Sequence, residues 1–249
     1  MHYLLEPDKR HNMQYLFESY VKDSLGSKYL ALISDDNRKK DFSLDSLPVS
    51  ELLIIKSEEV DFLFQLSLIL NKRIKDLNLE KLYYDIEAPL INILSKMEST
   101  GVTVDIKGLF NYSKELGADM SGLESDIHSI AGRNFNLGSP KQLGQVLFDE
   151  LKIGKGKVKK TKTGQYATGE EVLEKLSKDY EVVKKLLDWR QLGKLKSTYV
   201  DSLPLLVNEK TGRIHTTFNQ AVASTGRLSS TGPNLQNIPI RTKNGKRVR

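Results

Sequence analysis

Cysteine is absent from the 249-residue sequence. Disulfide bonds and thiolate metal sites are therefore excluded, and the absence fits a reducing cytoplasm. Long apolar runs are absent as well, since none approaches the roughly 20 residues that a membrane span requires. The first residues do not follow the order of a signal peptide. We therefore expect a cytoplasmic protein with no membrane partner, long enough for one large domain or two smaller ones.

Acidic residues are few in the second half of the chain. Residues 1–132 contain 15 Lys and Arg against 22 Asp and Glu, which gives a charge of −7. Residues 133–249 contain 23 against 10, which gives +13. A basic half joined to an acidic half indicates a polyanion partner for the second half only. The alternative explanation is an ordinary charged surface in contact with solvent.

Apolar residues at helical spacing dominate residues 85–203. One helix is predicted from Asp85 to Gly101, and a long one runs from about Tyr180 to Leu203, where Pro204 ends it. Between them, serine or threonine residues precede apolar stripes at the spacing of a helix cap, at Ser121, Ser139 and Thr168. This region is therefore predicted to be mostly helical. In the long helix, spacing assigns Trp189, Leu192, Leu195 and Tyr199 to the core and leaves Lys194, Lys196, Ser197 and Thr198 outside as donors.

After Pro204 the pattern changes to that of strands. β-Branched and aromatic residues stand on both sides of a predicted turn at Asn208–Gly212. The predicted fold class is therefore mainly α with a small β part (α+β), in which a helical region is followed by the first antiparallel strands of a sheet.

A lysine-rich loop separates two of the predicted helices. Lys155–Gly164 contains five lysines in ten residues, including Lys157, Lys159 and Lys160. We predict a mobile cationic loop, which would gain free energy on DNA by releasing counterions from phosphates. A solvated charged loop without a partner is the alternative.

The stretch Ser224–Arg241 reads S-T-G-R-L-S-S-T-G-P-N-L-Q-N-I-P-I-R, which is too rich in Gly, Pro and Asn for a helix or a central strand. Its arginine, amide and hydroxyl side chains form a run of hydrogen-bond donors. Leu228, Leu235 and Ile238 are expected to hold the loop on a core. An anchored loop lined with donors suits a surface that holds an acceptor-rich polymer.

Thirteen residues of this stretch, T-G-R-L-S-S-x-x-P-N-L-Q-N-I-P, resemble the start of the palm in family-A DNA polymerases, the DNA polymerase I family. The segment K-L-K-S-T-Y, Lys194–Tyr199, resembles the base of the thumb in the same family. The resemblance implies three regions. They are residues 1–84 as a remnant of a 3′–5′ exonuclease-like domain, 85–204 as the helical thumb, and 205–249 as the start of a truncated palm.

The resemblance also implies roles for single residues. Arg227 is expected to reach the minor groove at the primer terminus, where hydrogen-bond acceptors occur at every correct base pair. Arg241 is expected nearest the phosphates of an incoming nucleotide. The other expected DNA contacts are amides of the same stretch, donors of the K-L-K-S-T-Y segment and lysines of the loop: Asn234, Gln236, Asn237, Lys194, Lys196, Ser197, Thr198, Lys157, Lys159 and Lys160.

The metal-binding motifs of the family are not found in this sequence. Ile55 and Glu59 stand where the exonuclease has a tyrosine and a metal-binding aspartate. Carboxylates on one short helix do not hold two ions about 4 Å apart. The family implies Mg²⁺, held by two palm aspartates that would lie beyond Arg249. We therefore expect no catalytic residue and no metal ligand in this chain.

The sequence thus predicts a fragment of a bacterial DNA polymerase of the DNA polymerase I type. Its partners are primer–template DNA and, in the complete enzyme, a deoxynucleoside triphosphate (dNTP). The complete enzyme would add deoxynucleotides in repair and replication, whereas this chain alone is expected to be an inactive monomer that grips the duplex. A non-catalytic, sequence-independent DNA-binding protein is the alternative. A stand-alone exonuclease is disfavoured because its carboxylates are missing.

Overall fold

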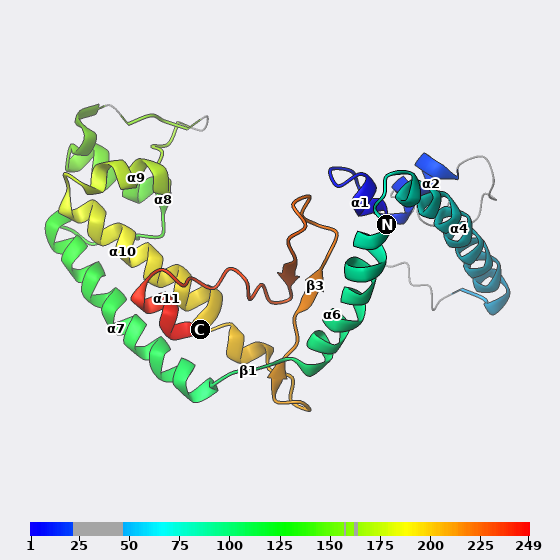
Figure 1. The fold of residues 1–249 in the computed structure, drawn as a ribbon. Helices are drawn as coiled ribbons and strands as arrows, with labels where there is room; N and C mark the ends of the chain where they lie inside the picture. Colours follow the sequence, from blue (N-terminus) through cyan, green and yellow to red (C-terminus); the bar gives the residue numbers. More distant parts are fainter. Residues whose placement is uncertain (22–46, 157, 162–163) are drawn as a thin grey trace. The chain divides into compact units, whose positions relative to one another are not determined.

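A computed structural model describes residues 1–21, 47–156, 158–161 and 164–249 of the chain (Figure 1). The structure divides into two compact units, each of which combines segments that are distant in the sequence. The first unit consists of Met1–Thr100 and Thr216–Gly232, and the second of Gly101–His215 and Pro233–Arg249. The expected domain boundaries at residues 84 and 204 follow a different division and stay predictions.

The first unit is mainly helical. Its helices are α1 (His2–Leu5), α2 (Met13–Tyr20), α4 (Val49–Asp76), α5 (Glu80–Leu82), the π-helical turn η3 (Tyr83–Glu87) and α6 (Ala88–Thr100). α2 packs on α4, where Phe17 and Phe62 are buried with ring centroids 5.3 Å apart. The buried α4 residues Phe62, Leu66 and Leu70 follow one another at intervals of four, so they share one face of the helix.

A two-stranded antiparallel hairpin completes the first unit. Its strands are β3 (Thr217–Asn219) and β4 (Ser229–Thr231). Hydrogen bonds to Glu98 and Glu87 fix it to α6 and η3. The Phe218 amide donates to the Glu98 carboxylate at 2.6 Å, and the Gln220 side chain donates to the Glu87 carboxylate at 3.0 Å.

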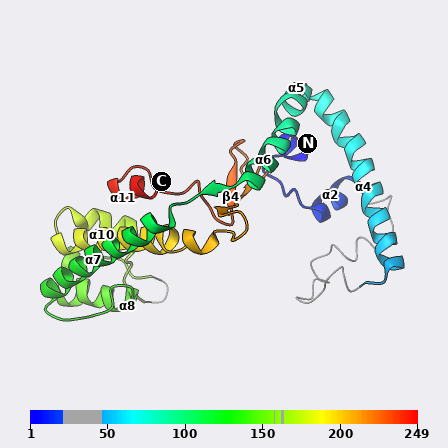
Figure 2. The same cartoon turned by 90° about the horizontal axis from the view of Figure 1, so that it is seen from below.

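The second unit is built around two long helices, α7 and α10, which lie side by side in both views (Figures 1 and 2). The elements of this unit are β1 (Val102–Thr103), α7 (Ile106–Ala131), α8 (Pro140–Gly144), η4 (Gln145–Glu150), η5 (Ile153–Gly156), α9 (Glu170–Ser177), α10 (Glu181–Leu195), η6 (Lys196–Val200), η7 (Leu203–Leu206), β2 (Arg213–Ile214) and α11 (Lys243–Val248).

Two hydrophobic clusters hold the second unit together. One joins α8, η4, α9 and the first half of α10, around the buried side chains of Leu143, Leu173 and Leu186. The other joins α7 to the second half of α10 and to η6, around Leu116 and Val200. α10 therefore contributes to both clusters and connects them.

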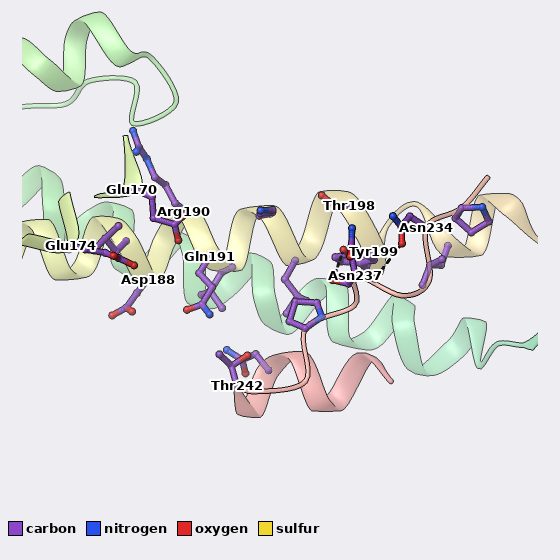
Figure 3. Close-up of a pocket in the computed structure, with 18 residues that line it drawn as sticks. Glu170, Glu174, Asp188, Arg190, Gln191, Thr198, Tyr199, Asn234, Asn237 and Thr242 are labelled. Carbon is purple, nitrogen blue, oxygen red and sulfur yellow. Dashed lines mark hydrogen bonds between the residues drawn. The ribbon is translucent and has the colours of Figure 1, made fainter. Parts of the chain in front are cut away.

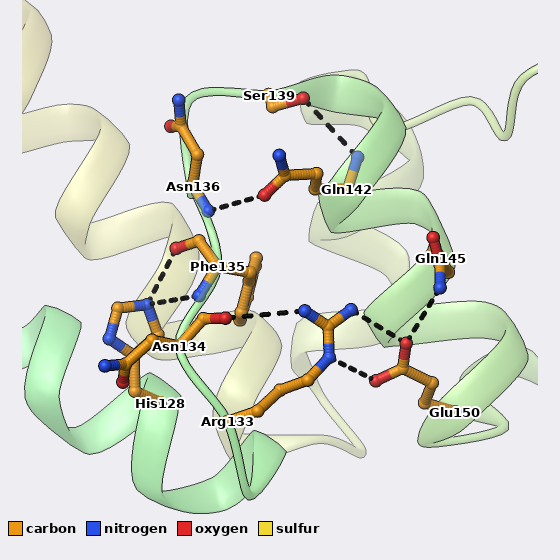
Figure 4. Close-up of polar contacts among 9 residues, drawn as sticks. All are labelled: His128, Arg133, Asn134, Phe135, Asn136, Ser139, Gln142, Gln145 and Glu150. Atoms are coloured by element: carbon orange, nitrogen blue, oxygen red, sulfur yellow. Dashed lines mark hydrogen bonds and ion pairs between the residues drawn. The ribbon is translucent and has the colours of Figure 1, made fainter.

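Side-chain hydrogen bonds hold the connection between α7 and α8 (Figure 4). Arg133 donates to both carboxylate oxygens of Glu150, at 2.8 and 2.9 Å, and these bonds hold the pKa of Glu150 below its usual value. The Ser139 side chain accepts from the Gln142 amide, with Pro140 at the first helical position. The predicted cap at Ser139 is thus confirmed.

The other two predicted caps are wrong. Ser121 lies inside α7, which continues to Ala131, and its hydroxyl donates back to the Gly117 carbonyl. α9 begins after Gly169 rather than after Thr168, and Gly169 has no side chain that could cap the helix. Both residues have the serine or threonine to glutamate spacing of a helix cap, but Ser121 lies inside its helix and Thr168 lies one residue before the N-cap residue of α9.

The long predicted helix ends in stages. α10 stops at Leu195, the π-helical turn η6 follows, and Pro204 lies in the 3₁₀ turn η7. The turn at Asn208–Gly212 is confirmed, because the Gly212 amide donates to the Asn208 carbonyl at 2.8 Å. The strand after this turn, β2, pairs with β1, which the sequence pattern did not indicate. The predicted fold class, mainly α with a small antiparallel β part, is confirmed.

Candidate functional site

A groove of about 1080 Å³ lies in the second unit, along α10 (Figure 3). One wall is formed by α9, α10 and η6, and the other by the segment Pro233–Asn244. The side chains that line the groove are Glu170, Glu174, Leu187, Asp188, Arg190, Gln191, Leu192, Lys194, Leu195, Thr198, Tyr199, Leu203, Pro233, Asn234, Asn237, Pro239, Thr242 and Asn244.

The helical wall presents alternating buried and exposed residues. Leu195 and Tyr199 are buried in the core of the second unit, whereas Lys194 and Thr198 are exposed on the groove. Positions four apart on a helix lie one above the other, so Lys194 and Thr198 form one row. The sequence predicted this division between packing residues and donors.

The other wall is held in place by tyrosine hydroxyls and apolar side chains. Tyr199 donates to the Asn237 carbonyl at 2.7 Å, and Tyr112 of α7 donates to the Asn244 carbonyl at 3.1 Å. Leu235 packs against the core of the second unit, as does Ile238. The expectation that these two apolar residues anchor the stretch is confirmed.

Local hydrogen bonds shape the anchored segment. The Asn234 side-chain oxygen accepts from the backbone amides of Gln236 and Asn237, at 3.1 and 3.2 Å, which forms an Asx turn. Further along, the Thr242 hydroxyl accepts from the Gly245 amide at 3.0 Å and caps α11. The conformation of this wall is therefore set by its own polar side chains.

α11 is held on α7 by one arginine, and it packs on the Pro239 segment through one glycine. Arg247 binds both carboxylate oxygens of Glu115, which lowers the pKa of Glu115, and its guanidinium lies 4.2 Å from the centroid of the Tyr112 ring. A Cβ atom on Gly245 would lie 2.7 Å from the Cβ of Pro239. A glycine is therefore required where α11 meets the Pro239 segment.

Three carboxylates lie at one end of the groove and were not foreseen from the sequence. They belong to Glu170, Glu174 and Asp188, and all three side chains are exposed. Arg190, between them and Lys194, donates to the Thr168 carbonyl at 2.6 Å. Burial lowers the pKa of Arg190, and the charge of Glu170 acts in the opposite direction.

Other predicted DNA-binding residues lie outside the groove. Lys196 is bound at 2.7 Å by Asp201 and also donates to Ser113 at 2.9 Å. Burial alone would raise the pKa of Asp201, but hydrogen bonds from Lys196 and Ser113 lower it below its usual value. The exposed residues Ser197, Gln236 and Arg241 do not line the groove, and the exposed Arg227 lies in the β3–β4 loop of the first unit.

Two lysines of the lysine-rich loop, Lys159 and Lys160, are paired through the backbone with residues that follow it. The Ala167 amide donates to the Lys159 carbonyl at 3.0 Å, and Lys160 pairs with Tyr166. The Lys160 ammonium lies 4.7 Å from the centroid of the Tyr166 ring, and a hydrogen bond to Asp149 raises the pKa of Tyr166. Lys155 belongs to the turn η5, and Lys157 lies outside the described residues.

Carboxylates and imidazoles are dispersed in the described ranges. Among these residues, no group of three or more His, Asp or Glu side chains is arranged to hold a metal ion. The described residues therefore do not fit the Mg²⁺ pair that the resemblance implies. In the same part of the chain, no helix is long and apolar enough to cross a membrane.

Comparison with known proteins gives consistent matches. Residues 106–249 match DNA polymerase family A. The chain is 42% identical over 251 residues to DNA polymerase I of Pseudomonas aeruginosa, covering 94% of this chain and 27% of that protein. It is 52% identical over 169 residues to DNA polymerase I of Bacillus subtilis, covering 68% of this chain and 19% of the relative.

A solved structure matches the whole chain. It is the polymerase domain of Pol1 from M. smegmatis in complex with DNA primer–template and dNTP, with a TM-score of 0.75 and 35% sequence identity. The match covers 100% of this chain and 39% of that one. The chain therefore spans well under half the length of the proteins to which it is similar.

Proposed function

Because this chain belongs to DNA polymerase family A, we propose that it is the part of a DNA polymerase I-type enzyme that holds primer–template DNA. The groove supports this proposal most directly. Lys194 and Thr198 come from one wall, and Asn234 and Asn237 come from the other, about forty residues later in the sequence. A lysine and uncharged donors on a concave surface suit phosphate and sugar oxygens, which carry no sequence information.

The rigidity of the groove also favours this function. A polymerase has to hold any sequence in one geometry, and preorganised walls lower the entropic cost of doing so. The Pro233–Asn244 wall is bound to α7 and η6 by the hydroxyls of Tyr112 and Tyr199. Within this proposal, Arg227 reads the minor groove at the primer terminus, and Arg241 contacts the phosphates of the incoming nucleotide in the complete enzyme.

The proposed activity of the complete enzyme is template-directed addition of deoxynucleotides. Mg²⁺ would stabilise the charges of phosphoryl transfer in that enzyme. The described residues of this chain offer no cluster that fits the ion, so we assign no catalytic step to them. Their proposed contribution is to bind and orient the duplex.

A pair of matched lysine variants tests the proposal. Lys194→Gln removes a charge from the groove, whereas Lys184→Gln removes one from an exposed position of α10 that does not line it. Binding of a fluorescent primer–template duplex is measured by anisotropy over a range of salt concentrations. We expect Lys194→Gln to weaken binding and to reduce the slope of log K against log salt by about 0.9, with little effect from Lys184→Gln. Equal slopes for both variants would contradict a phosphate contact in the groove.

A further inference from the structure

The charge of the side chains that line the groove changes from one end to the other along α10. Figure 3 shows Glu170, Glu174 and Asp188 gathered at one end, and Thr198, Asn234 and Asn237 at the other. The groove is also lined by Lys194, which is closer along the helix to Thr198, at the amide end, than to Asp188. Among the described residues, no ion pair joins any of the three carboxylates to a lysine or arginine side chain.

These carboxylates differ from their neighbours on the same helices. Glu171 of α9 is paired with Lys175 at 2.8 Å, and Glu181 of α10 lies 3.5 Å from Lys185. These two balanced carboxylates do not line the groove, whereas the three that line it have no ion pair with any described residue. A phosphate chain that followed the whole groove would meet them.

The distance between Asp188 and Lys194 determines how strongly a phosphate in the groove would be repelled. Asp188 and Lys194 are six residues apart on α10, which corresponds to a rise of about 9 Å. This rise is slightly shorter than the Debye length of about 10 Å at 0.1 M salt, so salt screens a phosphate at Lys194 from the carboxylates only in part. A phosphate one or two positions further on, at about 3.4 Å each, would lie well inside the screening length.

We propose that Glu170, Glu174 and Asp188 end the phosphate path in the groove and thereby set the length of duplex that the groove holds. This inference rests on the proposed DNA-binding function. Arg190 lies at the limit of the path, where the Thr168 carbonyl and the charge of Glu170 both compete with phosphate for its guanidinium. The carboxylates thus act as positioning residues for the DNA backbone rather than as ligands of a metal or a substrate.

Two triple variants with the same change in net charge test the inference. The first is Glu170→Gln, Glu174→Gln and Asp188→Asn, within the groove. The second is Glu171→Gln, Asp179→Asn and Glu181→Gln, at exposed positions of the same two helices or of the turn between them that do not line the groove. Anisotropy measures the affinity for duplexes that lengthen by one base pair at a time, at several salt concentrations.

We expect the groove variant to bind roughly three- to tenfold more tightly, because exposed charges each contribute little. Its salt slope should steepen by about 0.9 for each phosphate gained, and its affinity should keep rising to longer duplexes than that of the unchanged chain. The control variant should reach its plateau at the same duplex length as the unchanged chain. Asp188→Asn alone should act in the same direction as the groove variant with a smaller effect.

The outcomes separate the two proposals. If the unchanged chain binds duplex but both triple variants tighten binding equally, with the same plateau length, the carboxylates act through net charge only and the inference is wrong. If the unchanged chain does not bind duplex even at low salt, the proposed function fails and the inference fails with it. A longer plateau in the groove variant alone supports both.

Discussion

The hydroxyl of Tyr199 offers a sharp test of how the groove is built. Tyr199 is 8% exposed, and its hydroxyl donates to the Asn237 carbonyl at 2.7 Å. Tyr199→Phe keeps the packing of the ring and removes this single bond between the two walls. A net hydrogen bond contributes about 0.5–1.5 kcal/mol, and Asn237 is exposed enough for water to replace part of the loss. We therefore expect the second unit to lose about 1 kcal/mol of unfolding free energy.

The same loss should appear in DNA binding without a change in its salt dependence. A deficit of about 1 kcal/mol in the anchored wall corresponds to roughly fivefold weaker binding at most. The salt slope should stay constant, because no phosphate contact is removed. Urea unfolding followed by Trp189, the single tryptophan and a residue of the second unit, measures the stability, and anisotropy measures the binding.

A second tyrosine provides the matched control. Tyr84 is exposed in the first unit and donates to the Asn71 side chain at 2.8 Å, so Tyr84→Phe also removes one hydrogen bond. It should leave both the Trp189 transition and duplex binding unchanged. If Tyr199→Phe flattened the salt slope by about one unit, the hydroxyl would meet a phosphate and the anchoring argument would be refuted. Unchanged stability and binding would refute it equally.

Four further predictions concern activity, charge, mismatch discrimination and pH. The chain alone should show neither primer extension nor Mg²⁺-dependent DNA degradation, and measurable turnover in either assay would contradict this. Replacing Lys157, Lys159 and Lys160 by alanine should flatten the salt slope by up to about 3, whereas Arg227→Ala in the complete enzyme should change discrimination against terminal mismatches and leave the slope nearly intact. Burial lowers the pKa of His2, so the folded first unit favours its neutral form and should lose stability as the pH falls below about 6.5, which urea unfolding at pH 7.5 and pH 5.5 can check.

The helices could be predicted because packing in them depends on a local period. Leu192 and Leu195 of α10 and Tyr199 of η6 are buried at intervals of three and four positions, and the sequence alone assigned these three residues to the core. The strand β1 could not be found in this way, since two residues are too few to show an alternating pattern. Its pairing with β2 is a contact between segments more than a hundred residues apart.

The site could be predicted only where the sequence pattern indicates the role of a side chain. Four of the expected donors meet in one groove, because Lys194 and Thr198 share a helix face and Asn234 and Asn237 share an anchored turn. Lys196 was expected with them, but the ion pair with Asp201 depends on how η6 ends. The carboxylates of the groove were missed because nothing in the sequence shows that α9 lies beside the wall formed some sixty residues later.

The discontinuity of the two units has a consequence for the order in which the protein folds during synthesis. The hairpin β3–β4 is bonded to Glu98 and Glu87, which precede their partners by 120 and 133 residues. Gly101–His215 of the second unit is translated between these anchors and the hairpin. The α7–α10 core can therefore form on the ribosome before the first unit is complete, whereas the groove has to wait until residues Pro233–Arg249 have also emerged and can dock on a surface that is already folded.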